Sequence, residues 1–432
     1  MVLLSGWGNY PRAQVNLLSP ESGAVPAAII ASESLIPRGN GRAYGDAALN
    51  THATLSMLPS GRIIAFDQGR LTAEAGVTLA EIIAQFLPRG WHVPVSPGTK
   101  FVTVGGMIAA DVHGKNHHGA GSFGQHVESI ELARADGAIV TLTPGHPLFA
   151  ATTGGMGLTG VILSATFRMI PVETAFIRQE TRRAANLAEA MAAFEESQNW
   201  TYSVAWIDCL AAGGALGRSL IYLGEHARAD ELTGQAPLAL IRRRTKRIPF
   251  DFPGFVLNSF SVRAFNELYF RRGKIGQSII DTDTYFYPLD AILEWNRIYG
   301  RSGFVQYQCV IPKAASDSGI RAILQRVARA GTGSFLAVLK LFGKQDGLLS
   351  FPMEGYTLAL DFRATPAVLA LLNELDAIVA DHSGRVYLAK DARTSAQMLR
   401  RFYPRLAEFQ SIRNEADPNR RFTSLLSNRL DL

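Results

Sequence analysis

Histidine, lysine and glycine crowd together between Asp111 and Gly124, where the sequence reads DVHGKNHHGAGSFG. Three histidines, one lysine and four glycines fall within these fourteen residues. Imidazoles can ligate a metal, a glycine-rich backbone can hold a phosphate, and either can form one wall of a cofactor site. The segment alone does not choose among these three chemistries.

A metal site is the first of these chemistries. It requires three or four side chains that converge on one point. Suitable atoms are present on Asp111, His113, His117 and His118. A glycine-rich loop, however, does not give them the helical i, i+4 spacing that brings two ligands onto one face. We therefore expect no metal site here.

Two phosphate-binding motifs also fail. The run Gly114-Lys115-Asn116 resembles the end of a P-loop, but that motif needs Ser or Thr after the lysine and Gly where Ala109 stands. Residues 155–160, GMGLTG, match the dinucleotide pattern GxGxxG. That pattern needs a strand before it and a helix after it. Here residues 147–154 have helical character and residues 161–171 alternate like a strand, so the order is reversed.

The whole chain has the composition of a globular protein. Its 432 residues allow two domains, and a net charge of +6 favours anionic ligands or an anionic membrane surface, with no pattern that indicates nucleic-acid binding. Two cysteines exclude an iron–sulfur cluster held by four thiolates. Neither a signal peptide nor an apolar run of membrane-spanning length is evident. We expect a cytoplasmic protein, with peripheral contact at the inner membrane face.

The elements that must position the glycine-rich segments change character near Pro171. Before it, short strands alternate with a helix over residues 78–87, capped by Thr78 and Glu81, and with a hairpin that turns at Asp136-Gly137. After it, an amphipathic helix is predicted over residues 186–198. Further strands are predicted at residues 202–210, 219–224, 304–312, 334–343 and 356–362. This pattern predicts an α+β fold whose second half is an antiparallel sheet covered by helices.

Three glycine-rich pieces make sense together as a flavin site. RGNGRAYGD (38–46) is a tight turn whose backbone N–H groups can hold a diphosphate. PGTKFVTVGGMIAADVHGKN (97–116) supplies a second wall, in which small residues let a flat ring approach the backbone closely. GGMGLTGVI (154–162) would close the site.

In this order the three pieces resemble the FAD-binding domain of the vanillyl-alcohol oxidase superfamily. The match sharpens toward the members that oxidise a polyprenyl-phosphoryl ribose, through GWG, WNRIYGRSGFVQYQCVIP, LKLFG, LSFP and VYLAKDAR. The resemblance implies a two-subdomain FAD-binding domain at residues 1–171 and an antiparallel-sheet substrate domain at 172–385. Residues 386–432 would return to the FAD-binding domain.

The resemblance also assigns roles to single residues. It implies that FAD contacts Arg38, Gly39, Asn40, Gly41, Arg42, Ala43, Tyr44, Gly45, Asp46, Gly98, Thr103, Val104, Gly105, Gly106, His113, Ile162 and Tyr387. Lys390, in AKDAR, matches the active-site lysine of the superfamily members, and His113 would lie at the flavin. Lys115 and Asn116 would order the loop. A buried lysine can stabilise a developing alkoxide or, if its pKa is lowered, act as a base.

Substrate contacts are expected in the second domain. Gln306 and Gln308 lie two apart on a predicted strand, hence on one face, and suit the hydroxyls of a sugar. Lys340 could meet a phosphate, and Trp206 could form an apolar wall. On a strand that faces the site, this chain has Thr357 and Ala359 where other members carry Asn and Cys.

The implied reaction is FAD-dependent oxidation of the 2′-hydroxyl of a polyprenyl-phosphoryl ribose to a 2′-keto sugar. A partner reductase would then form the arabinose epimer for the cell envelope. We expect FAD to be bound non-covalently, because residues 38–50 contain no His or Cys and both cysteines fall in the substrate domain. Two alternatives stay open: a sugar-alcohol or aldonolactone oxidase that uses oxygen, and a metal-binding or structural protein.

Overall fold

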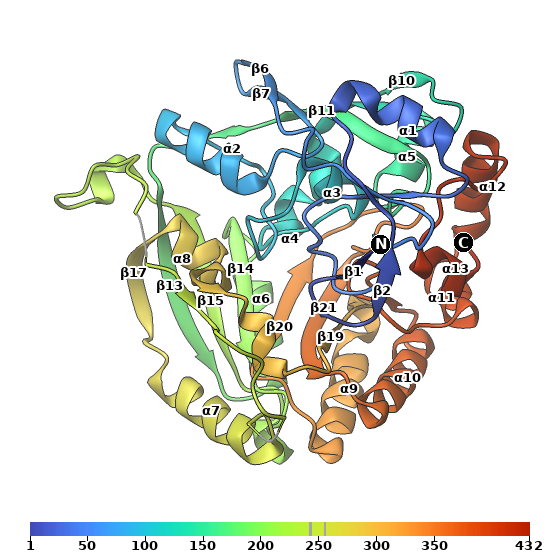
Figure 1. Cartoon of the computed structure of the whole chain (residues 1–432). Coiled ribbons are helices and arrows are strands. Elements are labelled where there is room, and N and C mark those ends of the chain that lie inside the picture. Colours follow the sequence, from blue (N-terminus) through green and yellow to red (C-terminus); the bar gives the residue numbers. More distant parts are fainter. Residues whose placement is uncertain (242–243, 255) are drawn as a thin grey trace.

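An eight-stranded antiparallel sheet dominates the computed structural model, which describes residues 1–241, 244–254 and 256–432 (Figure 1). Its strand order is β17-β13-β15-β14-β20-β21-β19-β22. The strands are β13 (Phe176–Ala184), β14 (Tyr202–Ile207), β15 (Ser219–His226), β17 (Gly276–Asp281), β19 (Phe304–Pro312), β20 (Ala337–Phe342), β21 (Gly355–Arg363) and β22 (Arg385–Val386). The five strands predicted after Pro171 all belong to this sheet, so the antiparallel prediction is confirmed.

The two faces of this sheet carry different side chains and have different surroundings, because successive side chains of a strand point to opposite sides. On one face, Tyr307, Cys309 and Leu358 pack into a continuous apolar core. The helices over this core are α6 (Leu187–Glu196), α9 (Ser316–Ala330) and α10 (Pro366–Asp381). On the other face, α7 (Ser259–Arg272) covers the outer strands, and the polar Gln306 and Gln308 point away from the helical core.

A second sheet lies in the N-terminal part, with strand order β10-β9-β11-β7-β6. Its strands are β6 (Ile63–Asp67), β7 (Arg70–Glu74), β9 (Val127–Ala133), β10 (Ile139–Leu142) and β11 (Val161–Arg168). The predicted hairpin is β9–β10, and Gly137 in its turn has a φ of +80°, which favours glycine. The helices of this part are α1 (Val25–Ala31), α2 (Leu79–Phe86), α3 (Val104–Ala109), α4 (His117–Ala120) and α5 (Pro147–Thr152).

Two local predictions in this part are confirmed. Helix α2 has the complete capping box, since Thr78 accepts from the Glu81 N–H and the Glu81 carboxylate accepts from the Thr78 N–H. The GxGxxG run stands between α5 and β11. A helix therefore precedes it and a strand follows it, which is the reverse of the dinucleotide-binding order.

Short pairings complete the fold. A parallel sheet joins β3 (Leu17–Leu18), β5 (Thr54–Ser56) and β4 (Ile36–Arg38). Two-stranded pairs form between β1 (Val2–Ser5) and β2 (Arg12–Val15), β8 (Trp91–His92) and β12 (Ile170–Pro171), and β16 (Lys246–Arg247) and β18 (Ile292–Leu293). Helix α8 (Thr282–Phe286) follows β17. Within the described ranges, no helix combines the length and apolar character that crossing a bilayer requires.

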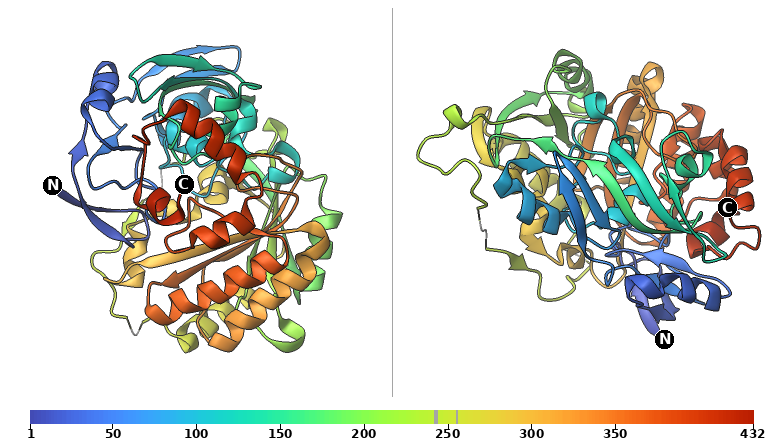
Figure 2. Two further views of the ribbon diagram at one scale, coloured as in Figure 1. Left: turned by 90° about the vertical axis from the view of Figure 1, so that its right-hand side faces the viewer. Right: turned by 90° about the horizontal axis from the view of Figure 1, so that it is seen from above.

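The C-terminal segment returns to the N-terminal part. Of its helices, α12 (Leu406–Ala416) and α13 (Leu425–Leu430) lie beside the N-terminal elements, and α11 (Ala396–Phe402) lies between α13 and α10 (Figure 2). Leu35 forms a parallel bridge with Phe422. The fully buried Arg413 guanidinium donates to the carbonyl oxygens of Leu158 and Phe422. Chain ends that are distant in sequence thus share one core.

Candidate active site

A cavity of about 550 Å³ lies between the glycine-rich segments and the polar face of the large sheet. It is lined by residues from both chain halves, and its size suits a bound organic molecule. The sequence-predicted site residues in its wall are Gly39, Asn40, Gly41, Arg42, Ala43, Tyr44, Gly98, Thr103, Gly105, Gly106, His113, Ile162, Gln306, Gln308, Lys340, Tyr387 and Lys390. The fold therefore brings most of the predicted residues to one place.

Five predicted residues do not line the cavity. Val104 is fully buried in the N-terminal core. The Arg38 guanidinium donates to the carbonyl oxygens of Ser5 and Ala48, and these hydrogen bonds stabilise the glycine-rich turn. Gly45 and Asp46 contact the C-terminal segment. Trp206 pairs across the sheet with the cavity residue Val338, but Tyr269 of α7 covers its ring and its indole N–H donates to the Phe335 carbonyl oxygen.

Missing side chains let the glycine-rich pieces of this wall pack closely against their neighbours. A Cβ atom on Gly39 would lie 2.3 Å from the Thr103 hydroxyl oxygen, so the two glycine-rich pieces touch directly. Gly41 has a φ of +63°, and a Cβ atom there would lie 2.3 Å from the Arg38 guanidinium. Gly98 meets nothing within 4 Å on its Cβ side. A wall of backbone and small residues fits a cofactor with a planar ring and a diphosphate, as FAD has.

The opposite wall is the polar face of three neighbouring strands. Gln306 on β19 pairs with Asp361 on β21, and Gln308 pairs with Ala359. Lys340 on β20 pairs with Thr357. Because these residues alternate with core residues, all of their side chains reach the cavity. Burial lowers the pKa of Lys340 to about 8, so an anionic group placed there would be the natural partner for its ammonium form.

Lys390 stands on the loop after β22 and reaches the cavity between the two walls. Its Nζ atom lies 3.6 Å from the centroid of the Tyr44 ring, a cation–π contact with the glycine-rich turn. Burial lowers the pKa of Lys390, the carboxylate of Asp361 opposes this shift, and Lys340 adds to it. A buried amine of this kind can change its protonation state near neutral pH, which proton transfer from an alcohol requires.

Asp361 is a cavity residue that the sequence reasoning missed. It is 1 % exposed, lines the cavity and accepts a hydrogen bond of 2.6 Å from the Gln306 amide. Burial raises its pKa, while Gln306 and Lys390 lower it. The signal was present in the alternation of β21, because Asp361 lies two residues beyond Ala359, which was already expected to face the site.

His113 connects the two walls. The Gln308 amide nitrogen lies 2.9 Å from its Nε2 atom, so Nε2 accepts and the hydrogen resides on Nδ1. Burial, followed by Lys340, lowers the pKa of His113 well below its usual range, which keeps the ring neutral. The ring packs against Tyr387, whose hydroxyl donates to the Ala110 carbonyl oxygen. Both side chains are held rigidly at the cavity wall.

The other two histidines of the opening cluster, with Lys115 and Asn116, organise the loop instead of lining the cavity. His117 bonds through Nε2 to the Gln345 amide oxygen, and His118 bonds to the Trp200 carbonyl oxygen. The Asn116 amide donates to the Pro94 carbonyl oxygen, and the Lys115 ammonium donates to the Tyr285 carbonyl oxygen. In the described part of the chain, no cluster of three His, Cys, Asp or Glu residues could hold a metal ion.

Comparison with known proteins agrees with this arrangement. A family model described as FAD binding domain matches residues 24–143, and one described as D-arabinono-1,4-lactone oxidase matches residues 358–430. The fold, the glycine-rich wall and these matches define an FAD-dependent oxidoreductase.

Full-length relatives narrow the assignment. Decaprenylphosphoryl-β-D-ribose oxidase of Mycolicibacterium smegmatis is 40 % identical over 99 % of this chain and 97 % of its own length. An uncharacterized protein of Streptomyces coelicolor is 38 % identical over 82 % of this chain and 100 % of its own. L-gulono-1,4-lactone dehydrogenase of Mycobacterium tuberculosis is 22 % identical over 96 % of both chains. The chain belongs to the decaprenylphosphoryl-β-D-ribose oxidase family.

Proposed function

We propose that the chain oxidises the 2′-hydroxyl of a polyprenyl-phosphoryl ribose to the 2′-keto sugar. The observation that carries this proposal is the polar wall of the cavity, where two glutamines and a buried lysine share one sheet face. Amide groups can both donate to and accept from sugar hydroxyls, and Lys340 supplies a positive charge for a phosphate. The name of the 40 % identical relative supports the same substrate class.

The residues of the cavity divide the chemistry between them. FAD, when bound at the glycine-rich wall, supplies the acceptor for the hydride that leaves the carbinol carbon. The hydroxyl proton must leave in the same reaction, and Lys390 is the buried group placed to receive it or to stabilise the developing alkoxide. Asp361, through its charge, keeps the pKa of Lys390 from falling further. Burial of these groups excludes water from the reacting atoms.

The apolar edge of the cavity could receive the lipid tail. Leu289, Ile292 and Leu293 line the cavity next to Arg247. Arg247 belongs to β16, which pairs with the strand that carries Ile292 and Leu293. Arg247 ends the basic run RRRTKR (242–247), which therefore reaches the cavity edge at this residue; Arg242 and Arg243 of the run lie outside the described residues. A keto sugar formed here would be the substrate of a partner reductase.

A substrate panel tests the proposed function. Farnesyl-phosphoryl ribose should reduce the flavin under anaerobic conditions much faster than free ribose, ribitol or an aldonolactone, because only the lipid-linked sugar engages both Lys340 and the apolar edge. The match to the lactone oxidase family at residues 358–430 favours the main alternative, a sugar-alcohol or aldonolactone oxidase that uses oxygen. Equal or faster flavin reduction by a free polyol or lactone would establish that alternative.

Non-covalent attachment of FAD is the second expected result. His113 is the histidine that lines the cavity, and its Nε2 atom is engaged by Gln308. Both cysteines are buried, Cys209 on the Ser334 backbone and Cys309 within β19. Precipitation with acid should therefore release the yellow colour into the supernatant. A yellow pellet would show a covalent bond.

Peripheral membrane contact is the third expected result. Apolar side chains are exposed beside basic ones in residues 240–241 and 244–250 and in α7. Phe250 is 60 % and Phe260 80 % exposed. Each Lys or Arg near an anionic bilayer contributes about 1 kcal/mol. We expect sedimentation with phosphatidylserine vesicles at low salt that is lost at high salt and is weakened by Arg244→Ala/Lys246→Ala. The exposed Arg321→Ala variant on α9 is the control, and equal binding of all three proteins would contradict the proposal.

A further inference from the structure

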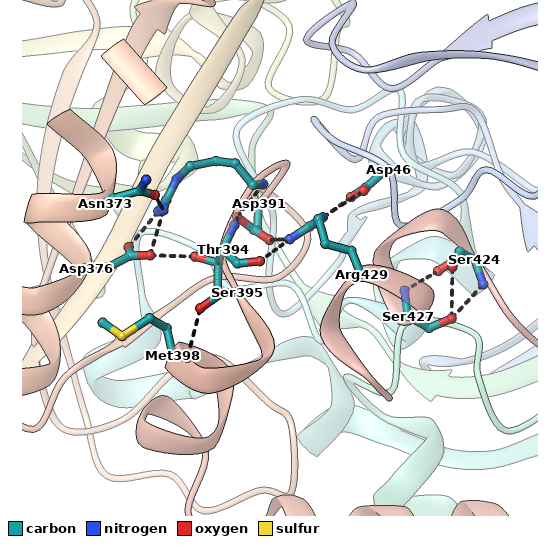
Figure 3. A network of polar contacts seen from close by, with 11 residues as sticks. Asp46, Asn373, Asp376, Asp391, Thr394, Ser395, Met398, Ser424, Ser427 and Arg429 are labelled. Carbon is teal, nitrogen blue, oxygen red and sulfur yellow. Dashed lines mark hydrogen bonds and ion pairs between the residues drawn. The ribbon is translucent and has the colours of Figure 1, made fainter. Parts of the chain in front are cut away.

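Arg429 of helix α13 forms ion pairs with two buried carboxylates at once (Figure 3). Its guanidinium lies 2.8 Å from Oδ1 of Asp46 and 2.9 Å from Oδ2 of Asp391. The side chains of the two aspartates are 5 % and 2 % exposed, and that of Arg429 is 24 % exposed. The same guanidinium also donates to the Thr394 carbonyl oxygen. One side chain thus joins helix α13 to the glycine-rich turn and to the loop that carries Lys390.

The two carboxylates belong to the two segments that meet at Lys390. Asp46 ends the glycine-rich turn, and Asp391 directly follows Lys390. The segments also touch through their backbones, because the Tyr44 N–H donates to the Ala389 carbonyl oxygen at 2.9 Å. A Cβ atom on Gly45 would lie 1.9 Å from the Asp391 carbonyl oxygen. A movement of either segment must therefore change the contact between the Lys390 ammonium and the Tyr44 ring.

A second ion pair fixes the far end of the Lys390 loop. The Arg393 guanidinium binds Asp376 of α10 with two hydrogen bonds of 2.7 and 2.6 Å, and the Thr394 hydroxyl donates to the same carboxylate. This pair holds the loop to the helical layer of the large sheet. Its polar partners are Asn373 of α10 and Thr394 of the loop itself. Arg429 supplies the link from the loop to Asp46, at the end of the glycine-rich turn (Figure 3).

Removal of the guanidinium would leave two buried carboxylates without their shared counter-charge. Repulsion between them, and the drive of each to regain water, would separate the turn from the loop. Catalysis tolerates little of this, because a displacement of about 1 Å can cost about 10²-fold in rate.

We propose that Arg429 is a positioning residue, which holds Lys390 in register with the glycine-rich turn by bridging Asp46 and Asp391. This inference rests on the proposed function, since that function gives Lys390 its role at the reacting hydroxyl. It adds a residue from the C-terminal helix, outside the cavity, to the groups on which the reaction depends. A lysine at this position keeps the charge, but its single ammonium group cannot reproduce the planar guanidinium, whose separate nitrogen atoms bind the two carboxylates.

The test compares Arg429→Lys with Arg400→Gln in the FAD-loaded enzyme. Arg400 of α11 forms an exposed ion pair with Asp431, with side chains 59 % and 68 % exposed, and so serves as a matched control. Hydrogen exchange of the amides of residues 387–395 is measured first, because it needs no substrate. Single-turnover flavin reduction and the apparent Kd for farnesyl-phosphoryl ribose are measured next. Arg429→Gln, which removes the charge entirely, is the second variant.

We expect at least tenfold faster exchange at residues 387–395 in Arg429→Lys, with unchanged exchange in β13 and β15. Flavin reduction should slow by about 10- to 100-fold, with less than a threefold change in Kd. Arg400→Gln should match the wild type. Uniformly faster exchange along the chain would make Arg429 a stability residue only, and unchanged exchange at residues 387–395 would overturn the proposal outright. If the lipid-linked sugar fails to reduce the wild-type flavin, the proposed function falls, while the exchange result still decides whether Arg429 fixes the loop.

Discussion

Replacement of Lys390 by alanine is expected to leave FAD bound and to slow flavin reduction by about 10²- to 10³-fold. The two glycine-rich pieces pack directly against each other at Gly39 and Thr103, and Lys390 adds only its contact with the Tyr44 ring, so flavin content should stay close to the wild-type level. The amine is the buried group placed to take up the hydroxyl proton or stabilise the alkoxide. Anaerobic stopped-flow measurement of a single turnover at saturating substrate isolates this step.

Lys313→Ala provides the control for this variant. Lys313 forms a partly exposed ion pair with Glu195, remote from the cavity lining. It should reduce its flavin as fast as the wild type. A Lys390→Ala enzyme with a near-normal single-turnover rate would remove Lys390 from the reaction.

Asp361→Asn is expected to move the pH dependence of flavin reduction to lower pH. The negative charge of Asp361 raises the pKa of Lys390 against the larger effect of burial. Loss of that charge lets the pKa of Lys390 fall further, so Lys390 loses its proton at lower pH. The direction is the same whether Lys390 acts as a base or as a cation. The limb of the pH–rate profile is the range in which the rate depends on the protonation of Lys390. Within this limb, a change of one unit in the pKa of Lys390 alters the rate at fixed pH by about tenfold.

Asparagine is close to aspartate in shape, and its amide oxygen can still accept from Gln306. The comparison is therefore one of charge. Flavin reduction measured between about pH 5 and pH 10 gives the position of the limb and also its sign. A rate that rises with pH indicates that neutral Lys390 is the base, and one that falls indicates that the ammonium stabilises the alkoxide. A limb that stays in place, or moves to higher pH, would contradict the assigned coupling.

Local chemistry made much of the fold predictable. Thr78 and Glu81 begin α2 as the capping box requires, and Asp136-Gly137 turns the β9–β10 hairpin. The alternation of polar and apolar residues placed Gln306 and Gln308 together on the cavity face. Each of these depends on residues within a few positions of one another.

Interactions between distant segments were less accessible. Trp206 lies on the expected face, but whether it lines the cavity depends on Tyr269 of α7, which covers it. His117 and His118 resembled His113 in the sequence, and only their hydrogen bonds to Gln345 and to the Trp200 carbonyl oxygen show that they order the loop instead of lining the cavity. The bridge from Arg429 to Asp46 spans 383 positions. No local sequence pattern predicts such a contact.

The same separation has a consequence for how the protein is made. A ribosome that adds roughly 5–20 residues per second takes roughly 20–80 s to travel from Asp46 to Arg429. Throughout that interval the carboxylate of Asp46 exists without its counter-charge, and for most of it the Lys390 loop has not yet been synthesised. The nascent chain can form its strands and helices, but the active site cannot be completed until helix α13, which carries Arg429, has been synthesised. Oxidative capacity therefore arises late and all at once, so a prematurely released chain is a poor flavin enzyme even when most of its residues are folded.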